Sequence, residues 1–331
     1  MQIKQRLEYP IWKTPYFCVV GLFVFFKLVR AGTLTLLINK PFFNKKLNLT
    51  LKFLNLLIYS ENKDEIGKKL LRCLINLGPG YIKFGQALST RPDLVDKKTC
   101  EYLKKLQDDM EPFSSSIAKN IIEKENHDSI DNIFSSFNEK PIANASVAQV
   151  HTAILKSGET VAIKILKPNI KEKLFKDFIF FYWVSKCLEI AIPSIKRLKL
   201  SKNVEVLSEV SLNELDLTLE ASAAEELSEN FKDNPNYKVP KIYWELTSKN
   251  MLVLEYIKGI RIDDIDALKK ANHNIKKITE IGTEVFFLQV FRDGFFHGDM
   301  HPGNILINPN GVLIPIDFGI MGRLSNKDRQ F

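Results

Sequence analysis

The stretch His297-Gly298-Asp299-Met300-His301-Pro302-Gly303-Asn304, together with Asp317-Phe318-Gly319, decides the fold of this 331-residue chain. The residues between the two motifs predict a β-hairpin, with strands at 305–307 and 312–316 and a turn at 308–311. A hairpin of this length returns the chain to the edge where it began, so Asp299, Asn304 and Asp317 are expected to converge. Carboxylate and amide oxygens are the ligands that Mg²⁺ prefers. The pattern therefore predicts a metal-dependent site at this edge.

A lysine on an earlier strand adds a second element to this site. Residues 146–153 and 160–166 predict another hairpin, and Val161-Ala162-Ile163-Lys164 lies on its second strand. Such a lysine usually faces water. Here it is suited to neutralise the phosphates of a nucleotide, while Asn304 and Asp317 hold the metal and Asp299 orients an attacking hydroxyl. V-A-I-K, H-x-D-x-x-x-x-N and D-F-G follow one another in the order of the protein-kinase motifs.

Three further groups complete the predicted nucleotide site. Of the acids on a helix expected over 204–231, we select Glu220 as the partner of Lys164. The segment 255–259, which includes Glu255 and Ile257 and follows the apolar strand residues 251–254, is expected to meet adenine through its backbone. The loop expected over the phosphates consists of Ala143, Asn144, Ala145 and Ser146. It lacks the glycines that let backbone amides wrap a phosphate, which argues against a conventional protein kinase.

The remaining periodicity predicts the organisation of the chain. Helices are expected over 64–106, with a break at Leu77-Gly78-Pro79-Gly80, and over 111–127, 171–191 and 275–292; a strand is expected over 238–244. The fold class is α+β, a protein-kinase-like two-lobe fold with a helical N-terminal extension and an incomplete C-terminal lobe. We divide it into a basic, Phe-rich segment at 1–63, the extension at 64–140, the N-lobe with a helical insert at 141–258, and the start of the C-lobe at 259–331.

The positive charge of the chain lies at its N-terminus. The whole sequence has 47 Lys and Arg against 39 Asp and Glu, and residues 1–60 hold nine of these basic residues and one acid. The remaining residues are neutral overall, which argues against a nucleic-acid partner. Four scattered cysteines give neither a metal pair nor a disulfide framework and favour a reducing compartment. A composition of 45% hydrophobic and 26% charged residues excludes a disordered or fibrous chain.

The apolar run at 14–26 predicts a segment that lies on a membrane rather than crossing it. Thirteen uncharged residues are too few for a span of about 20, and extending the run would place Lys27 and Arg30 inside the bilayer. Aromatic residues can enter the acyl boundary while the cations meet anionic headgroups; these aromatics are Phe17, Phe23, Phe25, Phe26, Phe42 and Phe43. An amphipathic helix pair packed on the core remains the alternative.

With these motifs in view, the sequence resembles the UbiB family of atypical, kinase-like proteins. The resemblance covers about residues 64–331 and includes Lys83-Phe84-Gly85-Gln86, which is similar to the family's K-x-G-Q signature, the alanine-rich loop, and Glu214-x-Asp216. It implies that Lys83 and Gln86 belong to an extension folded over the active site, where they engage Glu214 and Asp216. It also implies that the chain is truncated after Phe331, within a helix that Ser325 and Asp328 are expected to begin.

The resemblance implies a membrane-associated kinase or ATPase that uses ATP or ADP with Mg²⁺ and supports ubiquinone biosynthesis. Expected partners are the membrane surface, lipid-linked quinone precursors and other proteins of that pathway. The expected location is peripheral, on the cytoplasmic face of a bacterial inner membrane or an organellar matrix face. Three alternatives stay open: a prenylphenol hydroxylase, a nucleotide-binding pseudokinase scaffold, and a metal hydrolase built on His297, Asp299 and His301.

Overall fold

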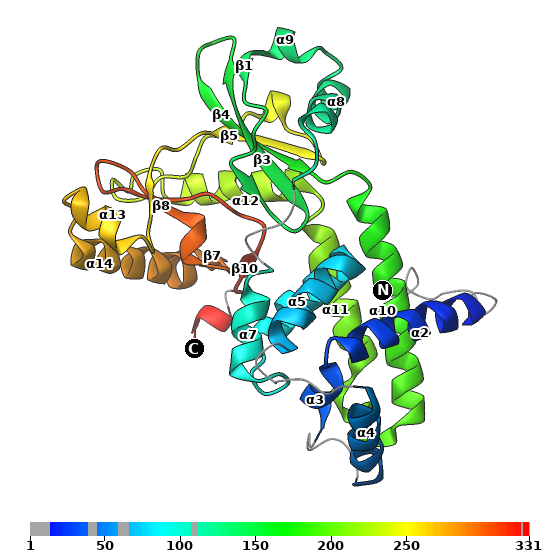
Figure 1. Cartoon of the computed structure of the whole chain (residues 1–331). Helices are drawn as coiled ribbons and strands as arrows, with labels where there is room; N and C mark the ends of the chain where they lie inside the picture. Colours follow the sequence, from blue (N-terminus) through cyan, green and yellow to red (C-terminus); the bar gives the residue numbers. More distant parts are fainter. Residues whose placement is uncertain (1–13, 39–44, 59–65, 107–111, 326, 331) are drawn as a thin grey trace. The chain divides into compact units, whose positions relative to one another are not determined.

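The protein is built from helices and antiparallel sheets, the α+β class expected from its sequence (Figure 1). The computed structural model describes residues 14–38, 45–58, 66–106, 112–325 and 327–330. The chain forms two compact units. The first contains the residues up to Pro112, Asn144–Ala148 and Lys167–Asn213, and the second contains Phe113–Ala143, Gln149–Leu166 and the residues from Glu214 onward. Each unit therefore combines segments that are distant in sequence.

The first unit is helical. Its helices are α2 (Thr14–Arg30), α3 (Thr33–Leu37), α4 (Lys45–Ile58), α5 (Ile66–Leu77), α6 (Pro79–Ser89), α7 (Lys97–Lys104), α10 (Ile170–Ala191) and α11 (Leu200–Asn213). Leu74, Tyr81, Leu103 and Phe180, which come from α5, α6, α7 and α10, are buried in one hydrophobic core. The predicted break between α5 and α6 is confirmed. Gly78 adopts a φ of 125° there, a conformation that favours glycine, and Pro79 begins α6.

One face of helix α2 is not covered by other described residues. Phe17 and Val24 are buried in the core of the first unit, whereas six large apolar side chains of the helix are more than half exposed; these are Tyr16, Val19, Leu22, Phe23, Phe25 and Phe26. No helix in the described part of the chain is both long enough and apolar enough to span a membrane. Phe42 and Phe43, which we also assigned to a membrane-facing surface, lie outside the described residues.

The second unit contains a sheet with strand order β1-β3-β4-β5, and β2 pairs with β3. The strands are β1 (Phe134–Phe137), β2 (Ala143–Asn144), β3 (Ala148–Leu155), β4 (Thr160–Leu166) and β5 (Met251–Glu255). The predicted hairpin is confirmed as β3 and β4. Side chains of β4 alternate between two faces: Val161, Ile163 and Ile165 pack in a core with Ala118 and Ile122 of α8 (Ser115–Asn126), so Lys164 points to the opposite face.

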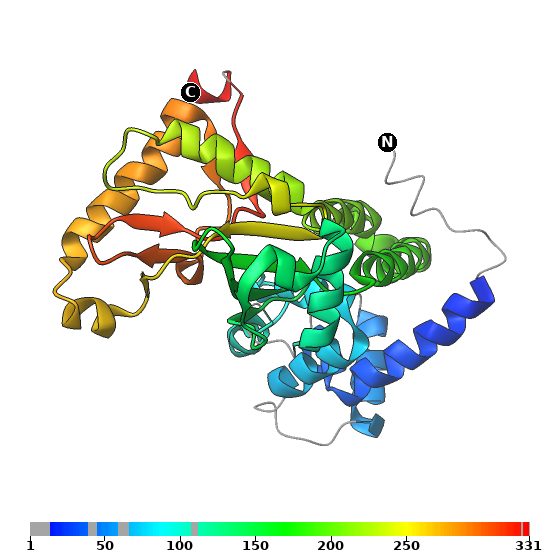
Figure 2. The same ribbon diagram turned by 90° about the horizontal axis from the view of Figure 1, so that it is seen from above.

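The rest of the second unit carries the catalytic motifs. Helix α14 (Ile275–Phe287) runs beside the second predicted hairpin, which is confirmed as β8 (Ile305–Ile307) and β9 (Leu313–Pro315), as Figure 2 shows. The smaller elements are α9 (Ile130–Ile133), β6 (Ile260–Arg261), α13 (Ile265–Lys270), β7 (Phe295–His297) and β10 (Met321–Arg323). Strand β6 pairs with β8, and β7 pairs with β10. These pairings fix both ends of the loop that carries Asp299 and Asn304.

Three predictions of secondary structure are wrong. The helical region expected over 64–106 has a second break, between α6 and α7, because the Asp96 side chain accepts the N–H of Thr99 and begins α7. The helix expected over 204–231 is two helices, α11 and α12 (Leu217–Asn230), because the Asp216 side chain accepts the N–H of Thr218 and begins a new helix. The strand expected over 238–244 is reduced to isolated bridges of Tyr237 with Leu313 and of Ile242 with Leu254. A 3₁₀ turn at Trp244–Leu246 follows.

Candidate functional site

The centre of the candidate site is the side chain of Lys164 between two carboxylates. Its Nζ donates to both oxygens of Glu220, at 2.7 and 2.9 Å, and lies 3.4 Å from Oδ1 of Asp317. Glu220 lies in the first turn of α12, where the partial positive charge of the helix N-terminus favours a carboxylate. The same carboxylate accepts the N–H of Phe318 at 3.4 Å. The predicted pairing of Lys164 with Glu220 is therefore present, and it extends to the D-F-G segment.

Burial and charge give these groups different acidities. Burial alone would lower the pKa of Lys164, but the attraction of Asp317 and Glu220 outweighs it, so the pKa of Lys164 lies above its ordinary value. Burial raises the pKa of Glu220 to about 7, against the opposing effect of Lys164. Burial would also raise the pKa of Asp317, but the Lys164 charge and a hydrogen bond from the N–H of Gly319 lower it to about 2. Asp317 is thus ionised throughout the physiological range.

The ring of His297 joins the catalytic loop to the D-F-G segment. Its Nδ1 accepts the N–H of Asp299 at 3.2 Å. Because Nδ1 is an acceptor, Nε2 carries the proton and donates to the backbone carbonyl of Asp317 at 2.6 Å. His297 is almost fully buried. A single imidazole therefore holds the backbones of Asp299 and Asp317, the two acids that the sequence assigned to catalysis and to the metal.

Asn304 lies at the same edge as Asp317. Ile305 is paired with Pro315, and the backbone carbonyl of Asn304 accepts the N–H of Ile316 at 2.9 Å. The residues next to this bond are Asn304 itself and, one position further, Asp317. A carboxylate and a side-chain amide together form an oxygen donor set that fits Mg²⁺. Asp317 and Asn304 are the residues that would hold the ion, and the lowered pKa of Asp317 supplies the charge that a hard cation needs.

The predicted hinge leaves backbone donors unused, and one of them belongs to Ile257. Glu255 ends β5, its side chain pairs with Lys238 at 2.6 Å, and its N–H donates to Lys241. The N–H of Tyr256 donates to Thr160. In the described part of the chain, the N–H of Ile257 has no hydrogen-bond partner. An unpaired amide at this position is a donor available to a purine ring.

The alanine-rich loop is a tight turn rather than an open glycine-rich loop. Ala143 and Asn144 form β2, and the N–H of Ala145 already donates to the carbonyl of Ala148 at 2.8 Å. Ser146 is buried. The Oδ1 atom of Asn144 is buried and has no hydrogen-bond partner among the described residues. The backbone of this turn therefore offers fewer amides to a phosphate than a glycine-rich loop does, while Asn144 retains one unused acceptor.

Comparison with known proteins agrees with the order of these motifs. The model of the ABC1 atypical kinase-like domain matches residues 105–331, more than half of the chain. The chain belongs to this family. Relatives named "Probable protein kinase UbiB" share 42% identity over 271 residues in Aliivibrio fischeri, which is 80% of this chain and 50% of the relative, and 41% over 298 residues in Shewanella woodyi, which is 88% and 54%. The chain spans about half the length of the curated relatives it matches.

A solved structure also resembles this one. The complex of Rv3197 with erythromycin from Mycobacterium tuberculosis aligns with a TM-score of 0.51 and 28% identity, over 84% of this chain and 68% of that chain. Both the assignment to the UbiB-type family and the kinase-like fold class are therefore confirmed. The roles of individual residues remain predictions.

The residues that the resemblance to the UbiB family assigned to regulation lie in different units. Lys83 and Gln86 lie on α6 in the first unit, where Nε2 of Gln86 donates to the carbonyl of Leu106 at 2.9 Å. Glu214 and Asp216 immediately precede α12 in the second unit, and Asp216 serves as the N-cap of that helix. The expected engagement of Lys83 and Gln86 with these acids stays a prediction.

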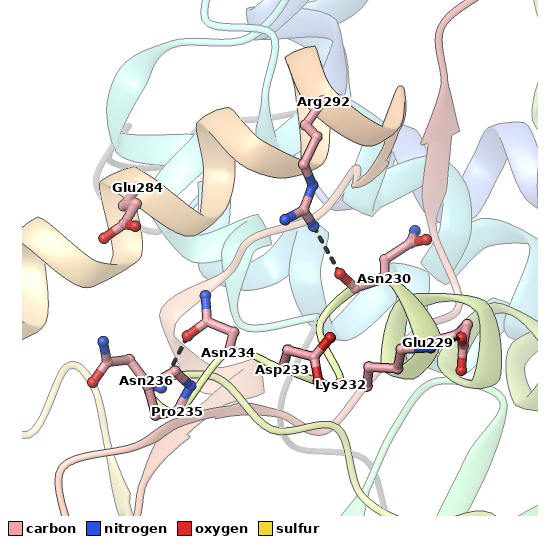
Figure 3. Close-up of a pocket in the computed structure, with 9 residues that line it drawn as sticks. All are labelled: Glu229, Asn230, Lys232, Asp233, Asn234, Pro235, Asn236, Glu284 and Arg292. Atoms are coloured by element: carbon pink, nitrogen blue, oxygen red, sulfur yellow. Dashed lines mark hydrogen bonds and ion pairs between the residues drawn. The ribbon is translucent and has the colours of Figure 1, made fainter.

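A surface hollow of about 550 Å³ lies away from the residues of the predicted site (Figure 3). It is bordered by the end of α12, the loop at 231–236 and α14, and Arg292 spans it with a 2.8 Å hydrogen bond to the carbonyl of Asn230. Charged side chains of both signs line it, including Lys232, Asp233 and Glu284. None of the predicted catalytic or metal-binding residues reaches it, so we do not assign the function to this hollow.

The metal-hydrolase alternative is wrong. Both ring nitrogens of His297 bond to backbone atoms, and Nδ1 of His301 accepts the N–H of Gly303. In the part of the chain that the structure describes, no three His, Cys, Asp or Glu side chains are placed to hold a metal together. Sequence reasoning gave His297 no role in the kinase-like site and so missed its bonds to the backbones of Asp299 and Asp317; its position two residues before Asp299 in an H-x-D motif was the available signal.

Proposed function

We propose that the protein is a UbiB-type atypical kinase or ATPase that acts on Mg-ATP. The observation that carries the proposal is Lys164 held between Glu220 and Asp317, because this arrangement fixes a cation beside an ionised metal-binding carboxylate. Lys164 would neutralise nucleotide phosphates, and the N–H of Ile257 would bind the base. Asp299 would accept a hydrogen bond from the attacking hydroxyl or water. Bound Mg²⁺, held by Asn304 and Asp317, supplies neutralisation of the phosphate charge.

The proposed pathway is ubiquinone biosynthesis, supported by the names of the UbiB relatives. The proposed acceptor or partner is a lipid-linked quinone precursor or another protein of that pathway. The hydroxylase alternative gains no support, because the geometry at Lys164 has no part in flavin or haem chemistry. A pseudokinase scaffold would bind the nucleotide without turning it over, and the experiment below separates these cases.

The test uses the full-length protein with Mg²⁺ and either ATP or ADP. The wild type is compared with Asp317→Asn, which keeps the shape of the side chain and removes its charge. Binding that requires Asp317, together with release of phosphate, would support a kinase or ATPase. Binding without turnover would identify a scaffold. Equal binding by both proteins would overturn the assignment of Asp317 as a metal ligand, and no binding by either would overturn the proposal.

We also propose that α2 attaches the protein peripherally to an anionic membrane surface, on the cytoplasmic or matrix face. Its exposed side holds apolar residues at helical spacing, flanked by Lys27, whose Nζ lies 4.4 Å from the Phe23 ring, and by Arg30 near Phe26. Aromatic rings suit the acyl boundary, and each cation near anionic headgroups contributes about 1 kcal/mol. The excess of nine basic residues over one acid in residues 1–60 selects anionic lipid as the occupant of this face.

A further inference from the structure

The C-terminal end of α14 changes its hydrogen-bonding pattern before it reaches the catalytic loop. Residues Leu288–Asp293 form a π-helical turn, and Gly294 ends it with a φ of 64°. Such turns are rare and often occur at functional sites. Gln289 lies in this turn, and its side chain is fully buried.

Both ends of the Gln289 amide are used. Its Oε1 accepts the backbone N–H of His297 at 2.9 Å, and its Nε2 lies 3.3 Å from the hydroxyl of Tyr237. The bond to His297 is buried. If the acceptor were removed, the N–H of His297 would be left without a partner in a place that water does not reach, a loss larger than the net value of an ordinary hydrogen bond.

The Tyr237 end connects the amide to the strand that precedes Asp317. The neighbours of Tyr237 pair with β9: the N–H of Lys238 donates to Leu313, and the N–H of Leu313 donates to Asn236. Tyr237 itself is buried, and its ring packs against Phe231 with centroids 4.6 Å apart. Gln289 thus links the segment paired with β9 to the first residue of the catalytic loop.

The Oε1 end of the Gln289 amide acts through His297. The imidazole of His297 holds the N–H of Asp299 and the carbonyl of Asp317, so any shift of its backbone moves both acids. We propose that Gln289 is a positioning residue, which sets the location of Asp299 and Asp317 by fixing the backbone of His297 from the π-helical turn. This inference rests on the proposed function, because Asp299 and Asp317 are the groups that it positions.

The experiment compares Gln289→Met with Gln289→Glu in the full-length protein. Methionine has a similar length and no acceptor, whereas glutamate keeps an oxygen for His297 and can accept from Tyr237. We expect Gln289→Met to lower kcat for ATP hydrolysis roughly tenfold, with the Kd for nucleotide within about twofold, because misplacement affects the reacting geometry more than binding. Gln289→Glu should restore most of that loss. Tyr237→Phe removes only the longer bond of the same amide and keeps the acceptor for His297, so it should lower kcat less than Gln289→Met does.

Hydrogen exchange gives a readout that does not depend on turnover. The amides of residues 297–299 should exchange faster in Gln289→Met and at the wild-type rate in Gln289→Glu, while the amides of β5 stay unchanged. Unchanged exchange at 297–299 in Gln289→Met overturns the inference. A similar loss of protection in both variants and throughout the second unit also overturns it, because that result indicates only a structural role. If the wild type binds nucleotide without hydrolysing it, the proposed turnover fails and the exchange result alone decides the role of Gln289.

Discussion

Replacing Lys164 by methionine removes the cation from the centre of the candidate site and keeps its length. In the wild type, Nζ lies 2.7 Å from Glu220 and 3.4 Å from Asp317. The side chains are 15% exposed for Lys164, 6% for Glu220 and 41% for Asp317. The two carboxylates would lose the same neighbour, but only Glu220 would be left charged in a buried place. The cost should therefore come mainly from Glu220.

The size of this cost depends on pH. An ionised buried carboxylate that loses its partner costs about 3–5 kcal/mol. Burial already raises the pKa of Glu220 to about 7, above its ordinary value of 4.5, and loss of Lys164 should raise it further. A carboxyl group with a raised pKa binds its proton more tightly when folded, so stability falls as pH rises. Relative to the wild type, the variant should lose about 3–5 kcal/mol at pH 9, and about 1.4 kcal/mol less for each pH unit from the new pKa down to about 7, below which Glu220 is protonated in both proteins.

Asp317 changes the pH dependence of stability in the opposite direction to Glu220, and more weakly. Lys164 lowers its pKa to about 2, so the stability it supplies is present above its unfolded value and is lost as pH falls. Because the side chain is 41% exposed, water screens much of this interaction. Its loss in the variant should be small beside the cost at Glu220, and it does not reverse the expected trend between pH 6 and pH 9.

The assay is urea unfolding followed by circular dichroism at pH 6 and pH 9. The control is Lys119→Met, which breaks an ion pair of 2.5 Å with Glu139 in the same unit but on the surface, where the two side chains are 36% and 61% exposed. This control should lose no more than about 1 kcal/mol at either pH. The reasoning would be refuted if Lys164→Met lost no more than the control at pH 9, or if its loss were the same at both pH values.

Three further predictions concern the first unit. Burial raises the pKa of Asp177 to about 6, so the free energy of unfolding should fall by roughly 3 kcal/mol as pH rises from 4 to 6. Asp177→Asn, which still accepts the N–H of Gly80, should remove this pH dependence in urea unfolding, and a wild-type stability that does not change with pH would contradict the prediction. The double variant Phe23→Ser, Phe26→Ser should lower the affinity for anionic vesicles, measured by co-sedimentation, at least tenfold, because burying each exposed ring in lipid contributes roughly 1.5–3 kcal/mol. Unchanged, salt-insensitive binding would exclude α2 as the element that binds the membrane. Gly85→Ala should lower the free energy of unfolding by about 1–3 kcal/mol, because the added methyl would overlap two leucine side chains; unchanged stability would show that the core can move aside.

The sequence predicted the site where local pattern and topology coincide. The hairpin at 305–315 is set by its turn, so Asn304 and Asp317 were correctly expected at one edge. Side chains alternate along β4, so Lys164 lies on the face opposite to the one that packs in the core, where an acid from another element can reach it. Among several acids on one predicted helix, Glu220 was the one found beside it. That choice held even though the helix itself was wrongly drawn as continuous.

What the sequence did not predict depends on contacts between distant residues. The segment that forms α11 and α12 was predicted as one helix, and the break between them is visible only in the structure, where the Asp216 side chain accepts the N–H of Thr218. Strands β7 and β10 have three residues each, too few for a pattern of alternation. The π-helical turn at Gln289 has a sequence that also fits an α-helix. In the folded chain, the Gln289 side chain in this turn accepts the N–H of His297, a contact between distant elements that the local pattern does not show.

The separate acidities of Glu220 and Asp317 explain how one lysine can serve two carboxylates with different tasks. Both lie beside Lys164, so the charge of the lysine cannot by itself distinguish them. The balance of burial against charge and hydrogen bonds distinguishes them. At the almost enclosed Glu220, burial outweighs Lys164 and the pKa rises to about 7, whereas at the partly open Asp317 burial is outweighed by Lys164 together with the N–H of Gly319, and the pKa falls to about 2. A pair of acids driven apart in this way has divided roles. The enclosed acid is suited to hold the lysine, and the open, ionised acid is suited to meet a metal ion from solvent.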